Sequence, residues 1–296
     1  MNRIVKNEKP CYDTLEAYIR KLKSAYPSVR VATCGKSAEG REIYAIVMGK
    51  GDRKIVYAGG THAQEWLTSL LLMRFCEDAL SGKEYMGYTL NALLERVTLI
   101  VIPEINPDGI EIALRGLSAC RKYRKTIFNI CNGDLWEWNA NARGVDINHN
   151  FNADWYSLRD YEEERGISSP SPRRYGGQYP ESEPETRAIT RFLRNVTVDM
   201  LISFHSQGEE IYYEYGKNTP GKSLGIARIF ASLTDYTLVK NEGHCAGGGL
   251  KDWFIEEIKK PAFTVEIGKG KNPLPLDAAD EIYEKIIPIL VMGLVL

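Results

Sequence analysis

Residues 54–66 have the sequence KIVYAGGTHAQEW, which predicts a strand, a glycine turn and the start of a helix. The apolar run at 54–58 is typical of a buried strand, the two glycines after it favour a turn, and the apolar residues of 66–80 recur with helical spacing. A turn at the C-terminal end of a strand can present neighbouring side chains to one point. We therefore expect His62 and Glu65 to face a common ligand.

Two other apolar segments end in side chains of similar chemistry. The segment MLISF precedes His205, and the segment AFTV precedes Glu266. An open α/β sheet places its ligand crevice at the C-terminal ends of its parallel strands. The three strand ends are therefore expected to meet, which would bring His205 and Glu266 to His62 and Glu65.

Two histidines and one glutamate form a known ligand set for catalytic zinc, which leaves one coordination position open for water. We predict one Zn²⁺ ion bound by His62, Glu65 and His205, with Glu266 as the carboxylate that handles protons. Each residue also has a simpler interpretation: a chance H-x-x-E tetrapeptide, a histidine of the core, or an acid at the surface. The combination favours the metal site, because the chain has only four histidines.

Composition excludes several classes of protein. The 296 residues are 44% hydrophobic and 26% charged, which are ordinary globular values, and the net charge of −1 favours neither a nucleic-acid partner nor a membrane partner. No apolar run is long enough to span a membrane, and the first residues lack the pattern of a signal peptide. These features predict a cytoplasmic location.

The six cysteines show no C-x-x-C pair and no regular spacing. In a chain of this length that pattern favours free thiols over a disulfide framework. A Cys120–Cys131 disulfide is the alternative.

Strands and helices alternate along the chain without a linker or a repeat, which predicts a single α/β domain over residues 1–296. We expect a mixed, mainly parallel central sheet covered by helices on both faces. The helix expected at 183–194 has Ser182 before it and Glu185 in its first turn, which is typical of a capping box. Residues 116–179 show little periodicity and are expected to form a long irregular pocket wall, the alternative being a disordered insertion.

The chain also resembles the zinc carboxypeptidase superfamily, the M14 metallopeptidases, over most of its length. The matching segments are GKSAEGR at 35–41, GTHAQEW at 60–66, NPDG at 106–109, RGVDINHNF at 143–151, SEPET at 182–186, FHS at 204–206, GLKDW at 249–253 and FTVE at 263–266. The resemblance implies that His62, Glu65 and His205 bind zinc. It also implies that Glu266 is the general base and acid.

The departures from the family pattern concern the substrate. Family carboxypeptidases usually have Asn-Arg-Asn-Phe where this chain has Asn148-His149-Asn150-Phe151, and that arginine grips the substrate's terminal carboxylate. Asn139 replaces the arginine that stabilises the oxyanion, and His244 aligns with the capping tyrosine. The residues expected to contact the substrate are Arg124, Arg143, Asn148, His149 and His244, and Arg121, Arg124 or Arg143 could replace the oxyanion arginine.

The segment WNANARGVD at 138–146 and the three glycines before Leu250 are similar to those of the γ-D-glutamyl-L-diamino acid peptidases. That subgroup cleaves the bond between D-glutamate and diaminopimelate or lysine in peptidoglycan stem peptides, which predicts a peptide or muropeptide substrate. The alternatives are a general metallocarboxypeptidase, a zinc deacylase of N-acyl amino acids and a non-catalytic protein that binds muropeptides.

Overall fold

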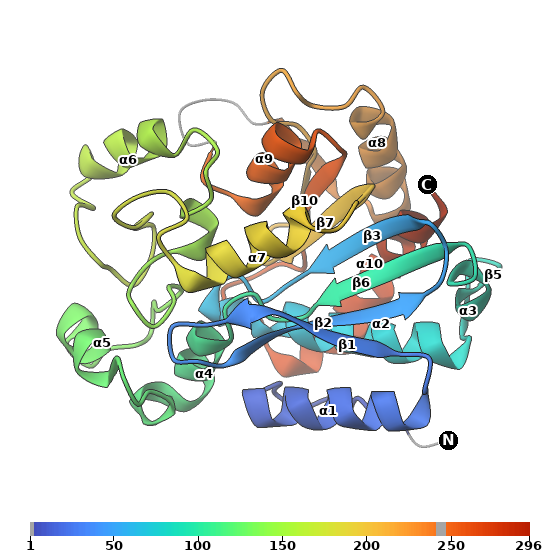
Figure 1. Ribbon diagram of the computed structural model, residues 1–296, viewed down its shortest axis with the longest axis horizontal. Coiled ribbons are helices and arrows are strands. Elements are labelled where there is room, and N and C mark those ends of the chain that lie inside the picture. Colours follow the sequence, from blue (N-terminus) through green and yellow to red (C-terminus); the bar gives the residue numbers. More distant parts are fainter. Residues whose placement is uncertain (1–2, 241–246) are drawn as a thin grey trace.

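A computed structural model describes residues 3–240 and 247–296. Within these residues an eight-stranded sheet has the order β1-β2-β6-β3-β7-β10-β8-β9 (Figure 1). Its strands are β1 (Arg30–Lys36), β2 (Glu42–Gly49), β3 (Arg53–Ala58), β6 (Val97–Ile102), β7 (Met200–His205), β8 (Glu210–Tyr212), β9 (Thr237–Val239) and β10 (Ala262–Glu266). A short hairpin of β4 (Glu84–Tyr85) and β5 (Tyr88–Thr89) stands apart from it.

The middle of the sheet is parallel, because β6, β3, β7 and β10 pair in parallel with one another. The edges are mixed: β1, β2 and β6 pair antiparallel, β8 is antiparallel to β10, and β9 is parallel to β8. The predicted mixed α/β sheet is therefore confirmed.

Helices cover both faces of the sheet (Figure 1). They are α1 (Tyr12–Ala25), α2 (Trp66–Ser81), α3 (Leu90–Leu93), α4 (Pro107–Arg115), α5 (Arg124–Cys131), α6 (Trp155–Glu163), α7 (Pro184–Arg194), α8 (Ser223–Thr234), α9 (Leu250–Trp253) and α10 (Ala279–Val295). Alternation along β3 shows how the layers form: Ile55 and Tyr57 pack on the side of α2 and α10, whereas Val56 and Ala58 pack on the side of α7 and α9. No helix of the described residues combines the length and apolar character that a membrane crossing needs.

The sequence-based prediction of an irregular stretch at 116–179 needs correction, because α5 and α6 lie within it. The predicted capping box is also wrong. Glu183 is the N-cap residue of α7, Pro184 begins the helix, and no side chain caps it. The Ser182 hydroxyl instead donates to Glu183 Oε1, while Glu185 accepts a hydrogen bond from Ala38 N–H and helps to hold the turn at 35–41.

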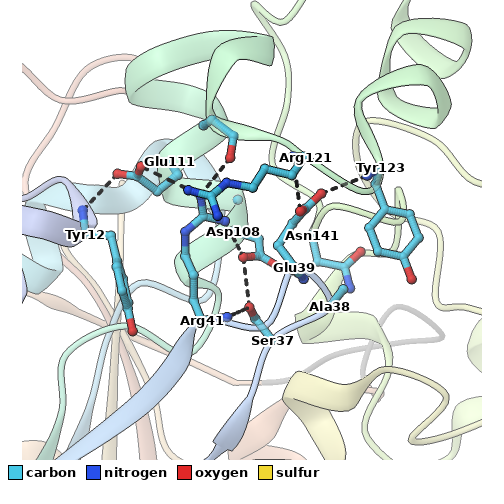
Figure 2. Close-up of polar contacts among 12 residues, drawn as sticks. Tyr12, Ser37, Ala38, Glu39, Arg41, Asp108, Glu111, Arg121, Tyr123 and Asn141 are labelled. Carbon is cyan, nitrogen blue, oxygen red and sulfur yellow. Dashed lines mark hydrogen bonds and ion pairs between the residues drawn. The ribbon is translucent and has the colours of Figure 1, made fainter.

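A polar network, buried at Asp108, ties that turn to the segment before α5 (Figure 2). Asp108 in α4 accepts hydrogen bonds from Ser37 Oγ at 2.8 Å, Arg41 Nη1 at 2.6 Å and the Glu39 backbone N–H at 2.7 Å. The carboxylate of Glu39 in turn accepts from three consecutive backbone N–H groups, those of residues 121–123, just before α5. The segment before α5 is thereby fixed to the turn between β1 and β2.

The cysteines Cys11, Cys34, Cys76, Cys120 and Cys131 are free thiols, so the alternative Cys120–Cys131 disulfide does not form. Cys245 and His244 lie outside the described residues.

Candidate metal centre and active site

Three side chains from distant parts of the chain meet at the C-terminal edge of the sheet. His62 follows β3, Glu65 precedes α2, and His205 ends β7. One potential ligand atom from each residue lies within 4.8 Å of the other two. The structure therefore brings together the three side chains that the sequence predicted to meet.

The backbone before His62 depends on glycine. Gly60 has φ +58°, and a Cβ atom there would lie 2.8 Å from Ile110 Cδ1 and 3.0 Å from the Glu104 Cα. Only glycine adopts this conformation in this space without strain. The glycine turn thus lets the chain pass close to α4 and present His62 at the strand end.

The two imidazoles present the same nitrogen to the centre of the cluster. His62 Nδ1 lies 2.8 Å from Glu65 Oε1, His205 Nδ1 lies 3.0 Å from Glu65 Oε2, and the two Nδ1 atoms are 3.3 Å apart. The outer nitrogens have separate partners. His62 Nε2 lies 3.1 Å from Asp146 Oδ1, and His205 Nε2 lies 3.1 Å from Ser203 Oγ.

This arrangement suits a cation. Outer partners of this kind fix the orientation of metal-ligating imidazoles and leave the inner nitrogens for the metal. Burial opposes ionisation of Glu65, but His62 and His205 outweigh it and lower the pKa of Glu65 to about 2. Burial likewise acts against the negative charge of Asp146, but His149 and His62 hold its pKa below the usual range. Two nitrogens and an ionised carboxylate fit the donor set of one zinc ion.

Glu266 lies beside the cluster at the end of β10. It is the parallel-strand partner of His205 and the antiparallel partner of Glu210. Burial, together with the negative charge of Glu65, raises the pKa of Glu266 well above its usual range. A carboxylate with a raised pKa is a stronger proton acceptor than an ordinary one when it is ionised.

A cavity of about 350 Å³ opens over this centre, and Glu266, Asn139 and His149 lie in its lining. His149 Nδ1 lies 2.7 Å from Glu162 Oε1. Burial lowers the pKa of His149, but Asp146 and Glu162 outweigh it, so that the net pKa is raised. The raised pKa favours the charged form of His149, at the position where an arginine stands in the family pattern.

The other predicted substrate-binding residues lie elsewhere. Asn148 Oδ1 accepts from the Leu250 backbone N–H, Arg143 Nε lies 3.5 Å from Glu183 Oε2, and Arg124 is exposed at the start of α5. None of these three belongs to the described lining of the cavity. Their roles in binding substrate stay predictions, as does that of His244.

Eight residues of the described cavity lining escaped prediction as site residues: Asp146, Arg173, Arg174, Ser206, Gln207, Glu210, Tyr212 and Asn272. The only available signal was the position of Asp146 in the RGVD segment. Arg173 and Arg174 lie in a stretch without periodicity, so their approach to the centre depends on how the wall folds back.

Known peptidases are similar to this chain over most of its length. Residues 15–286 match the zinc carboxypeptidase (peptidase M14) family. The gamma-D-glutamyl-L-diamino acid endopeptidase 1 of Lysinibacillus sphaericus is 33% identical over 291 residues, which cover 96% of this chain and 72% of the relative.

Solved structures share the fold. Bovine thrombin-activatable fibrinolysis inhibitor superimposes with a TM-score of 0.74 at 24% identity, over 97% of this chain and 96% of that one. The murein-tripeptide amidase of Escherichia coli O157 gives a TM-score of 0.58 at 21% identity, over 93% and 95% of the two chains. The predicted family resemblance is confirmed, and the cluster of His62, Glu65 and His205 could bind the single zinc ion that the family requires. This chain belongs to the zinc carboxypeptidase family and is a metallopeptidase.

Proposed function

We propose that this metallopeptidase hydrolyses the γ-D-glutamyl–diaminopimelate bond of peptidoglycan stem peptides. The observation that carries the proposal is the 33% identity, over 96% of the chain, to a relative named as a gamma-D-glutamyl-L-diamino acid endopeptidase. The arrangement of the cavity supports it. A proton-handling carboxylate stands beside the three-residue cluster, and charged side chains of both signs surround it.

In this proposal His62, Glu65 and His205 hold the zinc ion, and Asp146 and Ser203 keep the two imidazoles in position. A zinc ion bound there supplies a Lewis acid, which polarises the scissile carbonyl and lowers the pKa of a water molecule from ~15.7 towards ~7. The protein's own contribution is the orientation of the ligands before substrate arrives.

Glu266 carries the proton. Its carboxylate accepts a proton from the attacking water and then gives the proton to the departing amine of the diamino acid. The raised pKa of Glu266 makes its carboxylate the stronger acceptor for the proton of the water. The leaving amine must therefore come within hydrogen-bonding distance of Glu266.

The cavity also bears on the kind of peptide that is cleaved. A single imidazole at His149 cannot form the bidentate grip on a terminal carboxylate that an arginine forms. Its Nδ1 is already 2.7 Å from Glu162 Oε1. This disfavours an ordinary C-terminal exopeptidase.

The test is turnover of L-Ala-γ-D-Glu-meso-diaminopimelate by the zinc-loaded protein, followed by mass spectrometry. We expect release of diaminopimelate by the wild type and a loss of about 10²–10⁴-fold in Glu266→Gln, because that variant keeps the shape but cannot accept the proton. Zinc content, measured by atomic emission, should be equal in both proteins.

Two other substrates separate the alternatives. Cleavage of a hippuryl amino acid with no cleavage of the muropeptide would indicate a general carboxypeptidase. Cleavage of an N-acyl amino acid alone would indicate a deacylase. If zinc is bound and all three substrates stay intact, the proposal fails and a binding protein remains.

A further inference from the structure

We propose that the cavity sorts the two halves of its substrate by charge: Arg174 binds a carboxylate on the acyl residue, and Glu210 binds an ammonium group on the amine residue. The inference rests on the proposed function and extends it to the chemistry on either side of the scissile bond. Both residues line the 350 Å³ cavity.

The sheet places Glu210 at the Glu266 end of the site. Along the sheet, β3, β7, β10 and β8 are consecutive neighbours, so that His62, His205, Glu266 and Glu210 follow one another across the strand ends. Glu210 is the antiparallel partner of Glu266. The Tyr212 hydroxyl donates to Glu210 Oε2 at 2.7 Å and holds the carboxylate in place.

Arg174 lies at the end of the cavity that is opposite Glu210 in the strand order. Its backbone N–H donates to Asp146 Oδ2 at 2.9 Å, and the Asp146 N–H donates to the Tyr175 carbonyl at 2.8 Å. Asp146 also contacts His62, which is the ligand farthest from Glu210 in the strand order. The left-handed backbone of Arg174 (φ +65°) is thus held by the same carboxylate that orients a predicted metal ligand.

Neither charge is neutralised by the described part of the chain. Among residues 3–240 and 247–296, the guanidinium of Arg174 has no ion-pair or hydrogen-bonding partner, and Glu210 has no cationic one. The adjacent Glu209 differs, because its carboxylate pairs with Lys285 at 2.8 Å and Lys269 at 2.9 Å. Charges left unpaired beside a reaction centre are available to a ligand.

The position of the leaving amine decides which half of the substrate lies at each end of the cavity. The leaving amine has to meet Glu266 to receive its proton, so the amine residue lies at the Glu210 end and the acyl residue at the Arg174 end. A diamino acid that is joined through one amino group keeps its other amino group as a free ammonium, which Glu210 can bind. A glutamate joined through its γ-carboxyl keeps a free α-carboxylate, which Arg174 can bind through two N–H groups.

The experiment crosses two substrate changes with two variants. On the amine side, L-Ala-γ-D-Glu-L-Lys is compared with its norleucine analogue, which lacks only the ammonium group. On the acyl side, the same lysine peptide is compared with its D-isoglutamine analogue, whose α-carboxylate is an amide. The readout is the ratio of kcat/KM values within each pair.

We expect Glu210→Gln to reduce the lysine-to-norleucine ratio by about tenfold to a hundredfold and to leave the glutamate-to-isoglutamine ratio unchanged. Arg174→Gln should reduce the glutamate-to-isoglutamine ratio by a similar factor and leave the lysine-to-norleucine ratio unchanged. Glu209→Gln and Arg165→Gln, which change charges outside the cavity lining, should keep both ratios. The dissociation constants of the four peptides, measured by calorimetry in the Glu266→Gln background, should follow the same pattern without turnover.

Ratios that stay at wild-type values in Glu210→Gln and Arg174→Gln would overturn the inference, and so would equal losses on all peptides. Those results would leave the proposed function intact as long as the wild type cleaves the lysine or diaminopimelate peptide. Failure of the proposed function has a different signature, because the wild type itself would then cleave none of them.

Discussion

At the scale of single residues, Asp146 lies outside the proposed ligand set and contacts it through His62. We expect Asp146→Asn to weaken zinc binding about 10-fold to 100-fold, because the amide no longer supports the basicity of His62. Competition with a chromophoric chelator measures the affinity. Asp199→Asn, at the opposite end of β3 where Asp199 accepts from Lys54 N–H, should bind zinc as the wild type does. Unchanged affinity in Asp146→Asn would contradict the supporting role.

Glu104 predicts a dependence of stability on pH. Complete burial raises its pKa from 4.5 to about 8, one carboxylate oxygen accepts from Ser69 Oγ, and the other has no partner among the described residues. The folded state therefore binds the proton more tightly than the unfolded chain. This contribution to the free energy of unfolding is complete below about pH 4.5 and is lost as the pH rises through about 8.

Glu104→Gln keeps the shape of the buried side chain and removes its titratable group. Its free energy of unfolding relative to wild type should rise between pH 5 and pH 8.5 by on the order of a few kcal/mol, as measured by urea unfolding. Glu95→Gln at the exposed surface should show no such trend. A constant difference between Glu104→Gln and wild type across this range would mean that Glu104 is already ionised in the folded protein.

At the scale of elements, the segment before α5 depends on Glu39. Removing its carboxylate in Glu39→Ala leaves three backbone N–H groups of residues 121–123 without their acceptor. We expect faster hydrogen exchange at these amides and a loss of about 1–2 kcal/mol in stability. Mass spectrometry of exchange locates the change, and Glu42→Ala on the neighbouring strand should leave these amides protected. If these amides exchange as slowly in Glu39→Ala as in the wild type, the segment before α5 does not depend on Glu39.

The elements that were predictable are those with a clear period. Strands β3, β7 and β10 and helix α2 follow from apolar runs and helical spacing, and their ends supplied His62, Glu65, His205 and Glu266. Helix α4 is short and was missed, although Asn106 caps it and Pro107 begins it. Helices α5 and α6 were missed because their buried sides are narrow. The approach of Arg174 to the cavity depends on contacts 28 residues apart in sequence, which no local pattern reveals.

At the scale of the whole molecule, the site is a small addition to a large core. Residues on both faces of the sheet are buried independently of the cluster. Removal of zinc by a chelator should therefore abolish activity and lower Tm by several degrees, as loss of a ligand of the native state does, while circular dichroism keeps its folded form. Added zinc should restore the activity and the Tm. Unfolding on chelation would instead mean that the metal holds the fold together.

The order of strands across the sheet also governs when the enzyme can first act during its synthesis. A chain leaving the ribosome presents His62 and Glu65 early, and His205 lies 140 residues after Glu65. Strand β10 then has to insert between β7 and β8 before Glu266 reaches the centre. Such distant pairings form late, because loop closure precedes the contacts that reward it. With Glu266 in its proposed role, the nascent chain lacks its proton carrier until β10 has been made, so that the strand order delays hydrolysis until the sheet is nearly complete.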